Sequence, residues 1–225
     1  MISQLSAPTK AEIIYPDNDS QPMANNTIQF RWILVIQQNL DWLLAENANA
    51  FVAGDLFWYP IEGNNTIVNA PDVMVVLGRP KGDRLSYKQW EEDGIAPQVV
   101  FEILSPSNTG KEMAQKLLFY DRQVVREYYI YDPHRNELQG WLRGEYGLDS
   151  IESMVDWISP LLGIRFSLSK EELQIYRPDH KQFLSYIEIS QQLKSAEQQL
   201  EQERKQTKTM EDLLNQYRDR FGELQ

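Results

Sequence analysis

The chain of 225 residues is 42% hydrophobic and 11% aromatic, which is the composition of a folded protein with a sizeable core. It contains no cysteine, so disulfides, thiolate metal sites and cysteine nucleophiles are excluded. The formal net charge of −11 argues against broad electrostatic affinity for nucleic acid, although it does not exclude a local basic groove.

Neither the apolar runs nor the first residues suggest a membrane span or a secretion signal. No apolar run approaches the roughly 20 residues that cross a bilayer, and the segment MISQLSAPTKAEIIYP lacks a basic region followed by an apolar one. We therefore expect a soluble, cytoplasmic protein with no membrane partner. Residues 1–25 are rich in turn formers and predict an irregular arm, with candidate helix caps at Asn25, Asn26 or Thr27.

The segment from Ile28 to about Asn47 predicts a helix with one buried face. Its apolar residues recur at spacings of three and four positions, as they do in helices that pack on a core. They are Ile28, Trp32, Val35, Ile36, Leu40, Leu43 and Leu44.

Short segments rich in β-branched and aromatic residues follow this helix and predict strands. They are AFVAG, DLFWYPIEGNN, DVMVVLGRPKGD and PQVVFEIL. A second helix is predicted over Thr109–Arg122, and residues 126–147 predict a hairpin that turns at Pro133–Asn136. This succession predicts a sheet with helices packed on it, so we expect an α/β (α+β) domain over residues 26–180.

The C-terminal residues 181–225 show a heptad pattern. One register contains Tyr186, Leu193, Leu200, Thr207, Leu214 and Phe221, and the other contains Ile189, Ala196, Glu203, Met210, Tyr217 and Leu224. A pattern of this length predicts a coiled-coil helix that joins a second copy of the chain or a partner protein. The alternative is a single helix folded back on the domain, because Ala196, Glu203 and Thr207 weaken the middle of the seam.

Glu102 is a candidate site residue because it interrupts an apolar strand, where an ionised carboxylate is costly unless it is paired. Asp72, directly after Pro71, stands at the entrance of another predicted strand. If the two strands are neighbours, the carboxylates converge at one end of the sheet and suit a hard divalent cation such as Mg²⁺. The alternative is a strand-end or ion-paired glutamate with no chemical role.

Lys116 shares a face of the predicted second helix with Glu112 and Tyr120, which lie four residues to either side. This face either forms an ordinary helix salt bridge or points towards the carboxylates, where Lys116 would orient a water or help to deprotonate it. Between strand and helix, the turn SPSNTG supplies hydroxyls that could cap the helix or contact a phosphate.

The motifs PDVMVV, VVFEILSPSN, KEMAQKLLFY and REYYIYDP together resemble the Uma2-type endonucleases of the PD-(D/E)XK nuclease superfamily. The resemblance covers about Pro22–Pro133 and fades after Trp141, so it does not include the C-terminal helix. It implies an α-β-β-β-α-β core with a restriction-endonuclease-like fold and metal-dependent hydrolysis of phosphodiester bonds.

The resemblance assigns the acidic positions of the superfamily motif to Asp72 and Glu102. Leu104 stands where the superfamily has its lysine. Uma2-like sequences carry that lysine on the following helix, at the place of Lys116, and Glu112 stands where they commonly have Asp.

Further candidates surround this set. Gln29 lies in a segment where the superfamily often has an acidic or amide group near the metal. Asp55 is either an outer carboxylate of the site or, as we expect more, a turn residue at the end of a strand. Tyr120, on the face of Lys116, is a third candidate for the surroundings of the site.

Two functions follow from these residues. The first is a Mg²⁺- or Mn²⁺-dependent endonuclease acting on nucleic acid, with DNA the expected substrate, in which Asp72, Glu102 and the main-chain carbonyl of Ile103 hold the ion. The second is a catalytically weak or inactive nuclease fold that acts as an interaction module through its coiled coil, and the acidic composition favours it. A glycosidase could also use the carboxylate pair, but it leaves Lys116 without a role.

Overall fold

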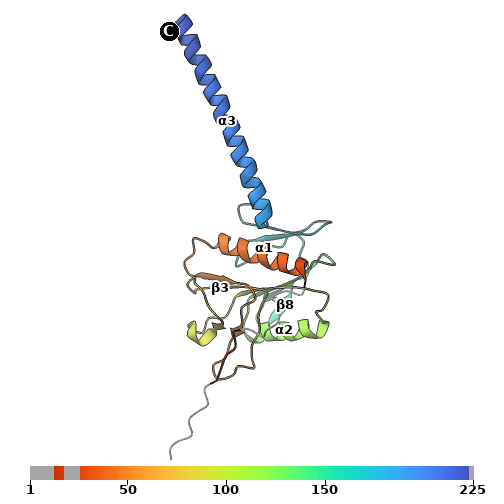
Figure 1. The fold of residues 1–225 in the computed structure, drawn as a ribbon. Coiled ribbons are helices and arrows are strands. Elements are labelled where there is room, and N and C mark those ends of the chain that lie inside the picture. Colours follow the sequence, from red (N-terminus) through yellow and green to blue (C-terminus); the bar gives the residue numbers. More distant parts are fainter. Residues whose placement is uncertain (1–12, 18–25, 223–225) are drawn as a thin grey trace, which may run out of the picture. The chain divides into compact units, whose positions relative to one another are not determined.

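The computed structural model describes residues 13–17 and 26–222 of the chain. The chain divides into two compact units, Met1–Phe183 and Leu184–Gln225. The first unit is built around a six-stranded mixed sheet with one helix on each face (Figure 1). This confirms the expected fold class. Most of the arm predicted over residues 1–25 lies outside the described residues.

The elements follow one another in the order helix, strands, helix, strands, helix. The helices are α1 (Thr27–Leu43), α2 (Gly110–Arg122) and α3 (Tyr186–Phe221). The strands are β1 (Ala50–Ala53), β2 (Trp58–Tyr59), β3 (Val73–Leu77), β4 (Tyr87–Lys88), β5 (Val99–Ile103), β6 (Glu127–Asp132), β7 (Glu137–Arg143), β8 (Leu148–Ser150), β9 (Arg165–Leu168) and β10 (Leu173–Tyr176).

The main sheet has the strand order β1-β3-β5-β6-β7-β8. Strands β1, β3 and β5 pair antiparallel, and α2 then crosses over the sheet so that β6 pairs parallel to β5. Strands β6 and β7 form the predicted hairpin, with Asp132 opposite Glu137 at its turn. The run α1, β1, β3, β5, α2, β6 therefore matches the α-β-β-β-α-β core that the family resemblance implies.

Some element boundaries differ from those expected. Helix α1 ends at Leu43 instead of Asn47, because Asn47 forms a turn in which its side chain accepts a hydrogen bond from the Asn49 N–H at 3.0 Å. Only Trp58 and Tyr59 of the expected strand over residues 55–65 are extended, and they pair with β4 in a separate small sheet. The short strands β8 to β10 were not predicted, because each has only three or four residues.

The two faces of the main sheet bury different apolar clusters. Val99, Phe101 and Ile103 of β5 pack in the cluster that includes the buried side chains of α1, whereas Val100 packs in the cluster around α2. Side chains alternate between the faces of a strand, so Glu102 points to the α2 face. This alternation decides which helix supplies its partners.

A second buried strand carboxylate, Glu127, connects the sheet to the segment that follows β8. It accepts hydrogen bonds from the hydroxyls of Tyr129 at 2.9 Å and Ser159 at 2.5 Å, and from the Leu161 N–H at 2.7 Å. Glu127 is fully buried, so these three donors replace the water that the carboxylate loses.

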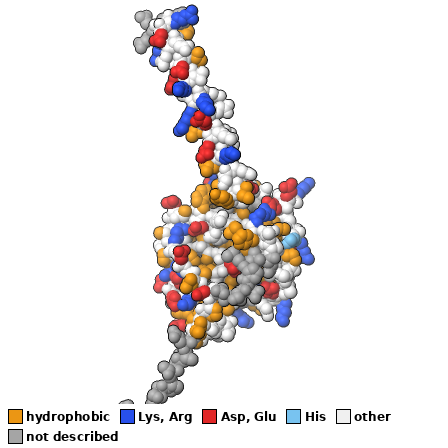
Figure 2. Space-filling model, in the orientation of Figure 1, with side chains coloured by type: hydrophobic (Ala, Val, Ile, Leu, Met, Phe, Trp, Pro, Cys, Tyr) orange, Lys and Arg blue, Asp and Glu red, His pale blue; other side chains and the backbone are white. Residues whose placement is uncertain are grey.

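The second unit consists mainly of α3, a helix of 36 residues. It begins with a capping box in which Ser185 and Glu188 satisfy each other's backbone N–H groups. Hydrophobic side chains are exposed along it between charged ones (Figure 2). Among the described residues no helix has the length and apolar character needed to cross a membrane. The coiled coil expected over residues 181–225 stays a prediction, and Leu224 of its seam lies outside the described residues.

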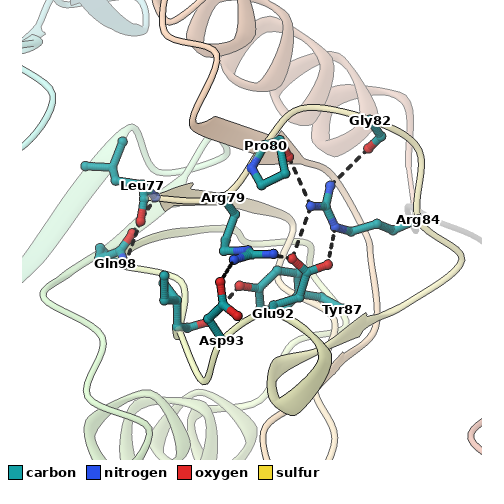
Figure 3. A network of polar contacts seen from close by, with 10 residues as sticks. Leu77, Arg79, Pro80, Gly82, Arg84, Tyr87, Glu92, Asp93 and Gln98 are labelled. Carbon is teal, nitrogen blue, oxygen red and sulfur yellow. Dashed lines mark hydrogen bonds and ion pairs between the residues drawn. The ribbon is translucent and has the colours of Figure 1, made fainter.

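The loop between β3 and β5 is anchored by the carboxylate of Glu92 (Figure 3). Arg79 Nε donates to it at 2.8 Å and Arg84 Nε at 2.6 Å, and Arg79 also pairs with Asp93. Arg84 holds the loop further through the carbonyls of Pro80 and Gly82. The hydrogen bond from Arg84 is the main cause that lowers the pKa of Glu92, so the pair stabilises the fold when the carboxylate is ionised.

Replacing Glu92 with alanine should lower the free energy of unfolding by about 1–3 kcal/mol at pH 7, because two largely buried guanidinium groups lose the carboxylate that they share. The matched control is Glu91→Ala, since the Glu91 side chain is 60% exposed and its contact with Lys88 is 3.6 Å. That control should cost less than about 0.5 kcal/mol in urea denaturation. Because the pKa of Glu92 is lowered, the difference should shrink as the pH falls through it. Equal effects of the two substitutions at pH 7 would contradict this account.

Candidate active site

Glu102 lies near the C-terminal end of β5, with its side chain only 2% exposed. Lys116 Nζ donates to its Oε2 at 2.7 Å, and the Tyr120 hydroxyl donates to its Oε1. Both donors come from α2, and their spacing of four residues stacks them one helical turn apart on the same face. The carboxylate is therefore tolerated in the core because α2 supplies a cation and a hydroxyl to it.

The turn between β5 and α2 sets the position of these donors. Thr109 caps the helix by accepting from the Glu112 N–H at 3.2 Å, and Glu112 accepts from the Thr109 N–H in return. The Asn108 side chain also donates to Glu112, at 3.2 Å. Glu112, a candidate for the surroundings of the site, thus belongs to the capping box of α2, and its charge helps to raise the pKa of Lys116.

Asp72 lies one residue before β3, directly beside the end of β5. The register pairs Val73 with Phe101, and the Ile103 N–H donates to Asp72 Oδ2 at 2.6 Å. The side chain of Asp72 is buried. Burial is the largest cause that raises its pKa to about 8, and the charge of Glu102 adds to the rise, while Lys116 and the Ile103 N–H act against it. The two predicted carboxylates therefore interact electrostatically at one end of the sheet.

Gln29 of α1 contacts the backbone of the same residue, Ile103. Its Nε2 donates to the Ile103 carbonyl at 2.9 Å, across 74 positions of sequence. Asn26 caps α1 and fixes the first turn that carries Gln29, because its Oδ1 accepts from the Gln29 N–H at 2.8 Å. A carbonyl oxygen has two lone pairs, so this contact leaves the Ile103 carbonyl able to accept one further ligand.

Asp55 contributes a third negative charge to this end of the sheet. Its backbone N–H donates to the carbonyls of Pro71 and Asp72 at 3.1 and 3.3 Å, which holds it beside the start of β3. The charge of Asp55 raises the pKa of Asp72 further. Its own φ of 49° belongs to the left-handed region that Asp tolerates better than most residues.

Tyr128 is a neighbour of the site that the sequence analysis did not single out. Its hydroxyl is buried and makes no hydrogen bond with any residue that the structure describes. Burial raises the pKa of this hydroxyl, followed by the charges of Glu102 and Asp72. Strand alternation could have found Tyr128, since Ile130, two positions further along β6, pairs with Glu102.

The charges and donors fit a divalent cation. The negative charges of Glu102 and Asp55 act on Asp72, and Lys116 opposes them only in part, since the pKa of Asp72 stays raised. The buried Tyr128 hydroxyl has no hydrogen-bond partner among the described residues, and a cation-bound water could supply one. Among the described residues no three His, Cys, Asp or Glu side chains already form a metal-binding group. Mg²⁺ commonly uses only one or two carboxylates and keeps several waters. Asp72, Glu102 and the Ile103 carbonyl are the groups that would hold it.

Comparison with known proteins identifies the family. The model of Uma2, described as "Putative restriction endonuclease", matches residues 20–175. The chain belongs to the Uma2 family. The crystal structure of a putative nuclease belonging to DUF820 from Anabaena variabilis is similar to this Uma2 protein, with a TM-score of 0.42 and 14% identity over 58% of this chain and 70% of that one. No curated protein matches it. The family resemblance noted in the sequence is thus confirmed.

Replacing Asp72 with asparagine should stabilise the metal-free Uma2 protein by about 1–3 kcal/mol at pH 8. The substitution removes a buried charge, while the amide oxygen can still accept the hydrogen bond from Ile103. Because the folded-state pKa of Asp72 is raised from 3.8 to about 8, the wild-type protein should lose stability as the pH rises across that interval. Thermal denaturation in EDTA over this pH range measures both effects.

The matched control is Asp83→Asn, because Asp83 is an exposed carboxylate. It should leave the pH dependence of the melting temperature unchanged. Adding Mg²⁺ or Mn²⁺ should then raise the melting temperature of the wild-type protein and of Asp83→Asn but not of Asp72→Asn. A lower melting temperature of Asp72→Asn than of the wild type in EDTA would contradict the assignment of an unfavourable charge to Asp72.

Proposed function

We propose that this Uma2 protein is a Mg²⁺- or Mn²⁺-dependent endonuclease that hydrolyses phosphodiester bonds of nucleic acid, with DNA as its substrate. The observation that supports this is the convergence of Asp72, Glu102 and Lys116 where β3 begins and β5 ends. Phosphodiester hydrolysis requires a cation, a positioned water and a positive charge near the phosphate, and these three residues supply or bind such groups.

Asp72 and Glu102 would hold the cation together with the Ile103 carbonyl. Each oxygen of Glu102 accepts one hydrogen bond from α2, so a lone pair of each is left for a further ligand. When bound, the cation would polarise the scissile phosphate and lower the pKa of a water. Gln29 donates to the Ile103 carbonyl and Asp72 accepts from the Ile103 N–H, and these two contacts keep the carbonyl in place.

Lys116 would act as a charged positioning group and not as a proton acceptor. Burial acts to lower its pKa, but the charges of Glu102 and Asp72 outweigh burial and raise it. The ammonium group is therefore protonated at neutral pH, and it can donate to the attacking water or to a phosphate oxygen while it holds Glu102. Tyr120 orients the other oxygen of Glu102 from the next turn of α2.

Purified protein with Mg²⁺ or Mn²⁺ should cleave DNA, and Glu102→Gln and Asp72→Asn should each reduce the rate by at least about 10²-fold, because each removes a charge that would hold the cation. Lys116→Met should reduce it similarly at saturating Mg²⁺, since it removes charge stabilisation. The measurement is nicking of supercoiled plasmid, with circular dichroism of each variant as the check on folding.

Glu137→Gln is the matched control, because Glu137 is an exposed carboxylate on β7, and it should cleave at the wild-type rate. Equal cleavage by the wild type and all site variants would identify a contaminating nuclease. Failure of the wild type to cleave any DNA or RNA with either metal would contradict the proposal and favour the interaction module.

A further inference from the structure

The apolar stripe of α3 offers a surface that is independent of the candidate active site. From residue 193 onwards, its large aliphatic side chains are between 49% and 62% exposed. They are Leu193, Leu200, Met210, Leu213 and Leu214. Isolated helices are marginally stable in water and gain most of their stability from packing such a face. A helix of 36 residues with this stripe therefore needs another surface to cover it.

We propose that α3 pairs with α3 of a second copy of this chain as an antiparallel coiled coil. The heptad positions that face the partner are a (Leu193, Leu200, Thr207, Leu214) and d (Ala196, Glu203, Met210, Tyr217). The charges on and beside this seam select both the partner and its direction.

Glu203 at position d argues against a parallel pair. In a parallel, in-register dimer each d residue faces its own copy, so the two Glu203 carboxylates would meet inside the seam. In an antiparallel dimer a faces d. With the middle of the pairing near residue 208, Glu203 lies opposite Leu214 of the partner subunit and Thr207 lies opposite Met210 of the partner subunit. The like charges are then separated along the helix axis.

The residues at position e support the antiparallel direction. They are Glu197, Arg204, Glu211 and Arg218. In an antiparallel pair e faces e, so Glu197 meets Arg218 of the partner subunit and Arg204 meets Glu211 of the partner subunit, and symmetry doubles both pairs. In a parallel pair e faces g instead, and the g positions hold three glutamines and a leucine, which give no ion pair. They are Gln192, Gln199, Gln206 and Leu213.

The same alternation of charge selects the register. Sliding one helix by a heptad in one direction sets Arg204 opposite its own copy and Glu197 opposite Glu211 of the partner subunit. Sliding it in the other direction sets Glu211 opposite its own copy and Arg204 opposite Arg218 of the partner subunit. Only one of the three registers pairs opposite charges throughout, so these residues would specify alignment more than affinity.

Distance measurement on the full-length chain tests the direction. The protein has no cysteine, so Ser195→Cys gives one site for a spin label, on the outer face of α3. An antiparallel pair centred near residue 208 separates the two labels by about 40 Å along the axis, at about 1.5 Å per residue. A parallel pair separates them by about 20 Å, which is the width of two helices. Light scattering should give twice the 26.4 kDa of one chain.

Charge exchange tests the pairing itself. Glu197→Arg with Glu211→Arg makes all four e positions of one variant positive. Arg204→Glu with Arg218→Glu makes all four e positions of a second variant negative. Each variant alone should dimerise at least tenfold more weakly than the wild type, and an equimolar mixture of the two should restore the dimer. The matched control for the second variant is Lys194→Glu with Lys208→Glu, which makes the same change in charge at outward b positions and should dimerise like the wild type.

Three results would overturn the proposal. The first is a wild-type protein that stays monomeric at about 100 μM. The second is a label separation near 20 Å in the dimer, which would indicate a parallel pair. The third is a mixture of the two charge variants that does not recover the dimer although circular dichroism shows that both are folded.

Discussion

The positions of β5 and α2 in this Uma2 protein are tied to the buried carboxylate of Glu102. A charge at the end of a central strand is tolerated only if donors reach it within the core. Strand alternation directs Glu102 to the face of the sheet that α2 covers. There the ammonium group of Lys116 and the hydroxyl of Tyr120, one helical turn apart on α2, donate hydrogen bonds to it. The capped turn from Ser105 to Thr109 must therefore start α2 at a fixed place, because a shift of one residue would carry Lys116 and Tyr120 off that face.

The second carboxylate, Asp72, is compensated much less well than Glu102. It has one backbone donor, and its interactions with Glu102 and Asp55 are repulsive. Natural sequences remove such conflicts from ordinary cores but keep them where a ligand resolves them. In the proposed cation site, Asp72 would lower the stability of the free protein and raise the affinity for a cation, which is a common relation between stability and function.

Local signals made part of the site predictable. A glutamate in an apolar run, an aspartate at a strand entrance and a lysine at helical spacing indicated Glu102, Asp72 and Lys116 as candidates. The family resemblance of the same segments implied the core topology. The contact of Gln29 with the Ile103 carbonyl joins residues 74 positions apart, so no local sequence pattern predicts this hydrogen bond. The small sheet of β2 and β4 escaped prediction for a related reason, since tertiary pairing and not propensity fixes two-residue strands.

Glu127 shows why a buried carboxylate alone does not identify a site. It is the first residue of β6 and is at least as deeply buried as Glu102. Its oxygens accept from two hydroxyls and a backbone N–H that connect β6 to the segment after β8. Those donors are neutral, and their hydrogen bonds are sufficient to explain Glu127 as a structural residue that links two segments of the chain. Glu102 differs because it draws a cationic partner from α2 and raises the pKa of a neighbouring carboxylate. Burial alone therefore does not distinguish a candidate cation site from a structural carboxylate. The distinction is that negative charge around Asp72 and Glu102 is only partly balanced by the neighbouring residues.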